Sequence, residues 1–273
     1  MNEKQDSIIK KANYFIKNAR YELSLTQQKL ILFVMAKVKT EDPEFLEYKI
    51  PILEMVKATG LSPEGAYTRI EKEAIALMKK VWTIEAYNEA GAETRTSLAW
   101  FASFYHEKGA GEVRVSFAPR LKPYLLQMKK CFTTYKLEYV LALRSTHSVR
   151  LYEYLKMKEG FRHEVYFDLE EFKEIFQLAN LPCYRQYGNI KSLFLLPSKK
   201  EITANTDLEI VRIKENKPSH RVVGFTIFFK EQIPPKEKEI RAETLKSLAS
   251  SATYDEILAN FDPDPIIFPE PQK

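Results

Sequence analysis

Residues 50–80, IPILEMVKATGLSPEGAYTRIEKEAIALMKK, contain two helix patterns separated by a break at Gly60. Before the break, apolar residues recur at helical spacing: Ile52, Met55 and Val56. After it, Ser62 and Pro63 suit the N-cap and first turn of a second helix. The apolar face of that second helix comprises Ala66, Ile70, Ala74, Leu77 and Met78. Two helices joined by a short glycine-containing turn are typical of a helix-turn-helix.

The segment after the second helix indicates the subtype. Residues 81–86 are β-prone, residues 87–96 are polar and contain Gly91, and residues 98–105 and 113–117 are again β-prone. Strands that flank a polar loop behind the second helix are typical of a winged helix. We therefore expect the wing of this domain at residues 87–96.

The helix that precedes this unit has a clear start signal. Ser24 and Gln27 have the spacing of a capping box, in which the two residues exchange hydrogen bonds between side chain and backbone. The apolar residues that follow recur every three or four positions: Leu30, Ile31, Phe33, Val34 and Val38. We expect a core helix that is buried around much of its circumference.

The same order of elements occurs again after two prolines, Pro119 and Pro123, which restrict the backbone and indicate a linker. The predicted elements are helices at 136–143 and 148–156, a strand at 164–167, a helix at 169–178, a turn at 180–182, a helix from about Arg185, and strands at 208–214 and 222–230 around a polar loop. We therefore expect an α+β protein with two tandem winged-helix domains, at residues 1–118 and 119–231.

Residues 232–273 differ in composition from the rest of the chain. They end in FDPDPIIFPEPQK and carry five basic against eight acidic side chains. Dense proline and acidic charge disfavour packing, so we expect a flexible C-terminal tail. The whole chain has a net charge of +5 and the tail has −3, which leaves +8 on the body. A basic body is consistent with a polyanionic partner.

The composition also restricts the compartment. Residues 1–15, MNEKQDSIIKKANYF, lack the apolar core of a secretory signal, and no apolar run approaches the ~20 residues that cross a bilayer. The only two cysteines, Cys131 and Cys183, lie far apart, as is usual in a reducing compartment. We expect a soluble cytoplasmic protein with no membrane partner.

Signals for catalysis are sparse. The four histidines are isolated, without a spacing that places two ligands on one metal: His106, His147, His163 and His220. The eight glycines are scattered and form no phosphate-binding loop. We therefore expect no catalytic site, no metal and no cofactor. The alternative within the enzyme class is a tyrosine nickase. An assay for cleavage of supercoiled DNA with divalent metal would separate such an enzyme from a DNA-binding protein without a catalytic site.

In the first domain, the face of the second helix that points away from the core carries groups suited to DNA. Thr68 and Arg69 can reach base edges, Lys72 suits a phosphate, and Gly65 would let a backbone approach closely. An ordinary solvated helix face is an equally good interpretation of this pattern alone.

In the second domain, polar side chains gather at the start of the second helix, the end that enters the major groove in helix-turn-helix docking. These residues are Tyr184, Arg185, Gln186, Asn189, Lys191 and Ser192. Arginine can bond guanine, and glutamine or asparagine can bond adenine. Lys217 and Arg221 of the second wing, and Arg150 near the linker, are candidate phosphate contacts. The alternative is a polar loop in which two tyrosines, Tyr184 and Tyr187, pack inward.

Three segments carry a resemblance to a known family: LTQQKLILFVMAKV (25–38), FTTYKLEYVLALRSTHSVRLYEYLK (132–156) and EITANTDLEI (201–210). They resemble the Rep_3-type plasmid replication initiators, the iteron-binding proteins of theta-replicating plasmids. The middle segment is the most specific, through Ser145, Arg150 and Leu151-Tyr152-Glu153. Two departures from the family pattern are His147, in place of an aromatic residue, and the apolar residues 193–198, where Pro197 should kink or end the helix.

The resemblance implies a pair of winged helices related by a pseudo-twofold axis, both of which contact one DNA repeat. It implies that monomers bind direct repeats (iterons) at a plasmid origin and open it together with the host replication initiator and the replicative helicase. It also implies homodimers, formed through the first domain, that bind an inverted repeat and repress the protein's own promoter, which contributes to plasmid copy number control. The alternative is a dedicated winged-helix transcriptional repressor, which would lack direct repeats beside its gene.

Overall fold

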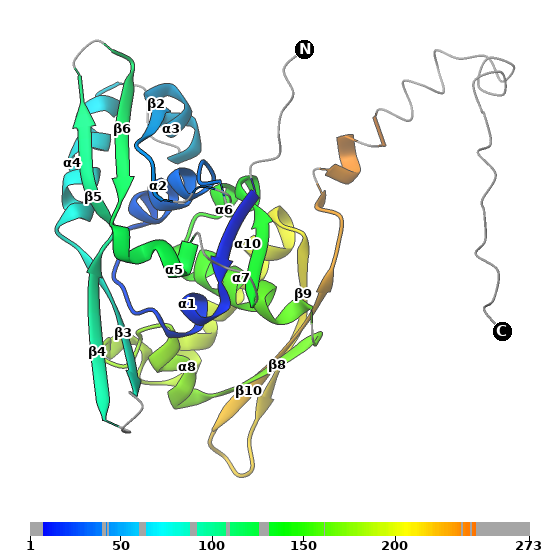
Figure 1. The fold of residues 1–273 in the computed structure, drawn as a ribbon. Helices are drawn as coiled ribbons and strands as arrows, with labels where there is room; N and C mark the ends of the chain where they lie inside the picture. The colour runs from blue at the N-terminus through cyan, green and yellow to red at the C-terminus, as the bar shows by residue number, and fades with distance from the viewer. Residues whose placement is uncertain are drawn as a thin grey trace, which may run out of the picture. The chain divides into compact units, whose positions relative to one another are not determined.

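The computed structural model describes residues 8–39, 42, 44–59, 64–87, 92–107, 110–125, 131–160, 162–235, 237–240 and 242–243 (Figure 1). The chain divides into two compact units, Met1–Gln232 and Ile233–Lys273. Both predicted winged helices belong to the first unit. Residues 244–273 of the predicted tail lie outside the described residues, so the flexibility of the tail stays a prediction.

The capping box predicted from Ser24 and Gln27 is confirmed at the start of helix α2 (Leu25–Met35). The backbone N–H of Gln27 donates to Ser24 Oγ at 3.2 Å, and the backbone N–H of Ser24 donates to Gln27 Oε1 at 3.1 Å. Residues 27–35 of the helix are all buried. Helix α2 is therefore the central support of the first domain, as its apolar spacing predicts.

The first helix-turn-helix consists of α3 (Ile52–Thr59) and α4 (Ala66–Met78), both packed on α2. Strand β2 (Tyr48–Pro51) pairs with β6 (Glu112–Phe117), which also pairs with β5 (Phe101–His106). Because the sheet order is β2-β6-β5, the wing is the β5–β6 connection at residues 107–111. The predicted position of the wing, residues 87–96, is wrong. The predicted start of α4 at Ser62 and Pro63 lies outside the described residues.

Residues 81–99 instead form an additional hairpin of β3 (Val81–Tyr87) and β4 (Glu93–Ala99), drawn in cyan in Figure 1. Most side chains of β4 are exposed or half-buried, so the strand lacks the apolar alternation that identifies strands in a sequence. The predicted single strand at 98–105 is interrupted at Trp100, whose buried ring packs edge-on against Phe15 and Tyr21. This break separates the hairpin from the winged-helix sheet.

The two domains are joined by a strand pair and by packed helical turns. Strand β7 (Phe132–Lys136) pairs antiparallel with β1 (Ile8–Ala12), so this strand pair joins residues on either side of the predicted boundary. Pro119 and Pro123, predicted to bracket a linker, lie in two short helices, η1 (Pro119–Leu121) and α5 (Lys122–Leu125). The last residue of each helix, Leu121 and Leu125, is buried in the core. The predicted domain boundary at residues 118 and 119 stays a prediction.

The second winged helix has the predicted order of elements. Helices α6 (Leu137–Ala142) and α7 (Thr146–Glu159) lead to β8 (Glu164–Asp168), α8 (Leu169–Ile175) and the turn η2 (Pro182–Tyr184). A helical segment then runs through α9 (Tyr187–Asn189), η3 (Ile190–Leu195) and α10 (Leu196–Asn205) to β9 (Leu208–Asn216) and β10 (Gly224–Glu231). The sheet order is β8-β10-β9, so the second wing is the connection at residues 217–223.

Pro197 changes the winding of the second helix without ending it. The six residues of η3 are π-helical, and α10 begins directly after them with Pro197 in its first turn. A π-helical turn bonds residue i to i+5 and is wider than an α-helical turn. The wider turn accommodates a ring that lacks an N–H and would otherwise clash with the carbonyl four residues earlier.

Among the described residues, no helix is long and apolar enough to cross a membrane.

Candidate nucleic-acid interface

The outward face of α4 carries the first group of candidate DNA contacts. Ala66, Ile70, Ala74 and Leu77 are buried, which fixes the rotation of the helix about its axis. Met78, predicted on the same apolar face, is instead exposed at the end of the helix. Thr68, Arg69 and Lys72 are exposed on the other side, as the apolar spacing predicts. Gly65 is the N-cap of α4, with a left-handed φ of 67°. A Cβ at Gly65 would meet no atom within 4 Å, so the backbone conformation, rather than crowding inside the protein, is what favours glycine there.

The second group surrounds the start of the recognition helix of the second domain, by which we mean residues 187–205. Its candidate residues are exposed: Arg185, Gln186, Asn189, Lys191 and Ser192. The Asn189 side chain donates to the Cys183 carbonyl at 2.8 Å, which ties the helix start to the preceding turn. Three kinds of side chain that can bond base edges, those of arginine, glutamine and asparagine, are therefore exposed together at the start of the recognition helix.

Tyr184 is a correction to the predicted set. Its ring is only 8% exposed, and its hydroxyl lies 3.0 Å from His147 Nε2. Phe194 stacks on the other side of this histidine, with ring centroids 4.4 Å apart. His147 therefore fills the position of the aromatic residue that the family pattern has there. Tyr184 serves the core between α7 and the recognition helix, because burying its ring is more favourable than exposing it.

The second wing is connected to the recognition helix through an acidic residue. Glu215 Oε1 lies 2.7 Å from Lys191 Nζ, and Glu215 Oε2 forms an ion pair with Lys217. The two lysines lower the pKa of Glu215 through these hydrogen bonds. Glu215 thus positions two of the predicted DNA contacts. Sequence reasoning missed this role, because 24 residues separate Glu215 from Lys191. The third candidate of this region, Arg221, is exposed.

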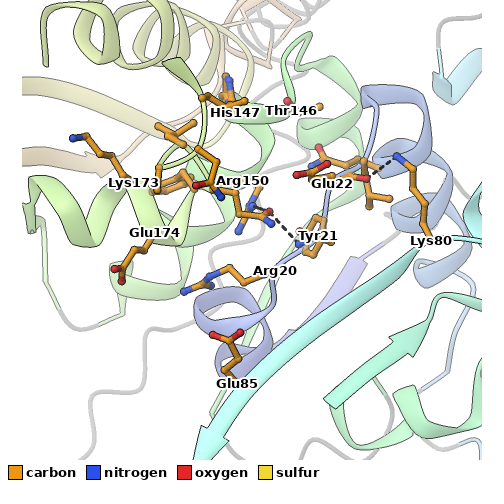
Figure 2. Close-up of a pocket in the computed structure, with 18 residues that line it drawn as sticks. Arg20, Tyr21, Glu22, Lys80, Glu85, Thr146, His147, Arg150, Lys173 and Glu174 are labelled. Atoms are coloured by element: carbon orange, nitrogen blue, oxygen red, sulfur yellow. Dashed lines mark hydrogen bonds between the residues drawn. The ribbon is translucent and has the colours of Figure 1, made fainter. Parts of the chain in front are cut away.

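Arg150 is a second correction, since its guanidinium joins the two domains instead of facing solvent. It donates to Gln177 Oε1 at 2.8 Å, to the Ile175 carbonyl at 2.7 Å and to the Ala19 carbonyl at 3.4 Å. It also lies over the Tyr21 ring, 4.9 Å from the centroid. Figure 2 shows Arg150 between Tyr21 and the segment around Lys173 and Glu174. Most of its donors are occupied by protein, so a phosphate would compete with these bonds.

Arg150 lines a groove of about 770 Å³ between the two domains. Both signs of charge occur on its walls (Figure 2): Arg20, Lys80 and Lys173 against Glu22, Glu85 and Glu174. The charges nearly balance, so the groove lacks the strongly positive character of a phosphate-binding channel.

Comparison with known proteins identifies the family. The sequence model of the family "Initiator Replication protein, WH1" matches residues 8–156, and that of "Initiator Rep protein, WH2" matches residues 168–229. Together they cover most of the chain. The protein belongs to the Rep3 initiator family. The family match and the two three-stranded sheets confirm the predicted fold of two winged-helix domains.

Two relatives of this Rep3 chain illustrate the likeness. A replication initiation protein of Escherichia coli is 26% identical over 215 residues, which is 75% of the chain and 65% of the relative. The chain thus spans about two thirds of the length of that protein. The crystal structure of the Pi initiator protein in complex with iteron DNA has a TM-score of 0.67 at 18% identity, over 85% of this chain and 99% of that one. At that identity the likeness concerns the fold.

The motif that carries the Rep3 resemblance has a structural explanation. Ser145 is the N-cap of α7, and its hydroxyl accepts from the backbone N–H of His147 at 3.1 Å. Tyr152 donates to Asp207 Oδ1 at 2.8 Å. Glu153 accepts from Lys11 Nζ on β1 at 2.9 and 3.0 Å, and from the hydroxyl of Tyr135 on β7. Ser145 therefore caps α7, whereas Tyr152 and Glu153 tie the helix to other segments of the chain.

The histidines of the Rep3 chain do not come together. Within the described part of the chain, no cluster of three or more His, Cys, Asp or Glu side chains could hold a metal ion. His147 is partly buried between α7 and the recognition helix, and burial lowers its pKa, with a smaller contribution from the Arg150 charge.

Proposed function

We propose that this Rep3 chain is a plasmid replication initiator that binds repeated double-stranded DNA sites at its origin and has no catalytic site of its own. The observation that carries the proposal is that the second helix of each winged helix exposes side chains of types suited to base edges and phosphates. Family membership supports the link to replication, and a relative of the same fold was solved with iteron DNA.

The physical basis of binding is the docking of each recognition helix in a major groove. Arg185, Gln186 and Asn189 of the second domain offer more base-reading groups than Thr68 and Arg69 of the first domain. We infer that the second domain supplies most of the sequence discrimination. Lys72, Lys191, Lys217 and Arg221 supply contacts to phosphates or bases, and the net charge of +8 on residues 1–231 favours association with DNA.

The family resemblance extends the proposal to assembly and regulation. The monomer binds the direct repeats. The homodimer, formed through the first domain, binds an inverted repeat and represses the promoter of the chain's own gene. Both forms act in the cytoplasm. Binding and bending energy favour opening of the origin, and ATP-driven unwinding is left to the host replication initiator and the replicative helicase.

Footprinting on the DNA that flanks the encoding gene tests the proposal. We expect protection of tandem direct repeats beside an A·T-rich stretch, in two adjacent major grooves per repeat about 10.5 bp apart. A DNA circle that carries these repeats should replicate only when the chain is supplied. Protection of one inverted repeat alone, without replication of the circle, would make the chain a dedicated repressor. Cleavage of the supercoiled circle with divalent metal would make it a nickase.

A further inference from the structure

The exposed face of the recognition helix changes from polar to apolar along its length. Asn189, Leu193, Leu196 and Lys200 follow one another at intervals of four, three and four residues, and all are exposed. Leu193 is 53% exposed and Leu196 is 49% exposed. Two leucines thus lie on the same stripe as Asn189, a predicted base-reading residue. Because both are exposed, they add little buried apolar surface to the core of the domain.

The π-helical turn explains why this stripe includes Leu193. Ile190, Phe194, Leu195 and Ile202 are buried and hold the helix against the domain. Because η3 has i to i+5 bonding, its wider turn leaves three consecutive side chains facing outward: Lys191, Ser192 and Leu193. Leu196, three residues after Leu193, is its neighbour on the helix surface.

The position of the leucines along the helix matches the size of a major groove. Leu196 lies nine positions after Tyr187, which is at most about 13.5 Å along the helix axis at the α-helical rise, and less because η3 is π-helical. The major groove of B-DNA is about 12 Å wide. When the start of the helix enters the groove, both leucines remain over its floor. The main apolar group that this floor presents is the C5-methyl of thymine.

We propose that Leu193 and Leu196 read thymine methyl groups in the repeat. The inference rests on the proposed function, because it requires that this helix docks in a major groove. The charge around the two leucines favours DNA over a protein partner as the occupant. Lys200 follows them and is exposed. Lys191 precedes them and is also exposed, with Glu215 as its ion-pair partner, while Lys199 beside them donates to the Val211 carbonyl at 2.6 Å. Each buried methyl should strengthen binding about four-fold.

The experiment replaces thymine by deoxyuridine, which lacks only the methyl group. The probe is a duplex of about 30 bp, roughly three helical turns, that the full chain selects from a random-sequence pool. Each thymine of the selected site is replaced in turn, and affinity is measured by fluorescence anisotropy. We expect replacement at one or two adjacent positions to weaken binding by the full chain about four-fold at each.

The variants Leu193→Ala and Leu196→Ala then assign each methyl group to a side chain. At the thymine that the replaced leucine contacts, each variant should bind the thymine and deoxyuridine duplexes equally. At the thymine that the remaining leucine contacts, the variant should still prefer thymine. Leu193→Met, which retains an apolar contact, should keep most of the preference. Leu53→Ala is the matched control, because Leu53 is also exposed on a helix, α3, outside the recognition helix. Thermal melting verifies that all variants fold.

The outcomes separate this inference from the proposed function. A chain that selects no sequence from the pool contradicts the proposed function itself. A chain that selects a site but binds every deoxyuridine duplex like the thymine duplex contradicts only the role of the leucines. A thymine preference that persists in both alanine variants also overturns it.

Discussion

At the scale of single residues, the structure separates exposed candidate DNA contacts from groups that serve the core. Arg185, just before the recognition helix of the second domain, and Lys72, on α4 of the first domain, are both exposed, while Tyr184 and Arg150 are engaged inside the protein. The two exposed residues should act differently, because arginine can bond two atoms of a guanine whereas lysine acts as a point charge toward phosphate.

Arg185→Ala should weaken binding to the cognate repeat by about 1–3 kcal/mol and relax the preference at one base pair. Lys72→Ala should weaken binding to cognate and scrambled repeats alike, and make the salt dependence shallower by about one unit of log K against log[salt]. Titration of both variants against both DNAs at several salt concentrations measures this. Equal losses on both DNAs for Arg185→Ala would show that Arg185 does not read a base.

His147 should make the stability of the second domain depend on pH. Burial holds its pKa below the ordinary value of 6.5, so the unfolded chain binds a proton at higher pH than the folded one does. The free energy of unfolding should therefore fall as the pH drops below about 6.5 toward the folded pKa. His147→Phe, which keeps the stacking on Phe194, should remove this part of the dependence and lose about 1 kcal/mol for the hydrogen bond to Tyr184.

Urea denaturation at about pH 7.5 and pH 5.5 checks this prediction. The quantity compared is the change in unfolding free energy between the two pH values, in the variant and in the unaltered chain. His163→Gln is the control, because His163 is exposed. If His147→Phe loses as much stability on acidification as the unaltered chain does, other groups account for the pH dependence.

At the scale of elements, helix α7 is the part that connects the two domains. Its residues bond β1, β7, the turn after α8 and the start of β9, so it contacts segments from both ends of the first unit. The ion pair of Lys11 and Glu153 is the most buried of these connections, with both side chains 3% exposed. Removing one charge from such a pair is costly, because the other charge stays in the interior without its partner.

Glu153→Gln should therefore reduce the free energy of unfolding by about 3–5 kcal/mol. Replacing Lys11 and Glu153 together by methionine should restore part of this loss, because no buried charge remains. Glu138→Gln is the control: Glu138 is exposed on α6 and lies 3.6 Å from Lys136, so we expect a change within about 0.5 kcal/mol. Chemical denaturation measures all three. Equal stability of the single and double variants would contradict the proposed cost of the unpaired lysine.

At the scale of the whole molecule, the charge distribution predicts how binding responds to salt. The body carries +8, and a polycation that neutralises phosphates releases condensed counterions. The slope of log K against log[salt] should be roughly −4 or steeper for two docked domains, at about −0.9 for each phosphate contact. Anisotropy titrations between low and moderate salt measure it. A slope near zero would mean that the positive body does not face DNA.

Sequence patterns were most informative where local signals and burial agree. The capping box of α2 follows from the polar pair Ser24 and Gln27. The buried face of α4 and the elements of the second winged helix from β8 to β10 follow their apolar spacing, because burial imposes a period on the sequence. They were least informative for the β3–β4 hairpin, whose solvated strand β4 has no such period, and for the first wing, whose position depends on which strands pair.

The order of elements in the second winged helix, the rotation of α4 and the exposed position of Lys72 were contained in the sequence, since they follow from local spacing. Which polar residues turn inward was decided only by tertiary structure. Tyr184, Arg150 and Glu215 each find partners far away in the sequence, at His147, Ala19 and Lys191. A hydrogen bond or ion pair depends on distance in space, and sequence periodicity carries no information on contacts between elements that are distant along the chain.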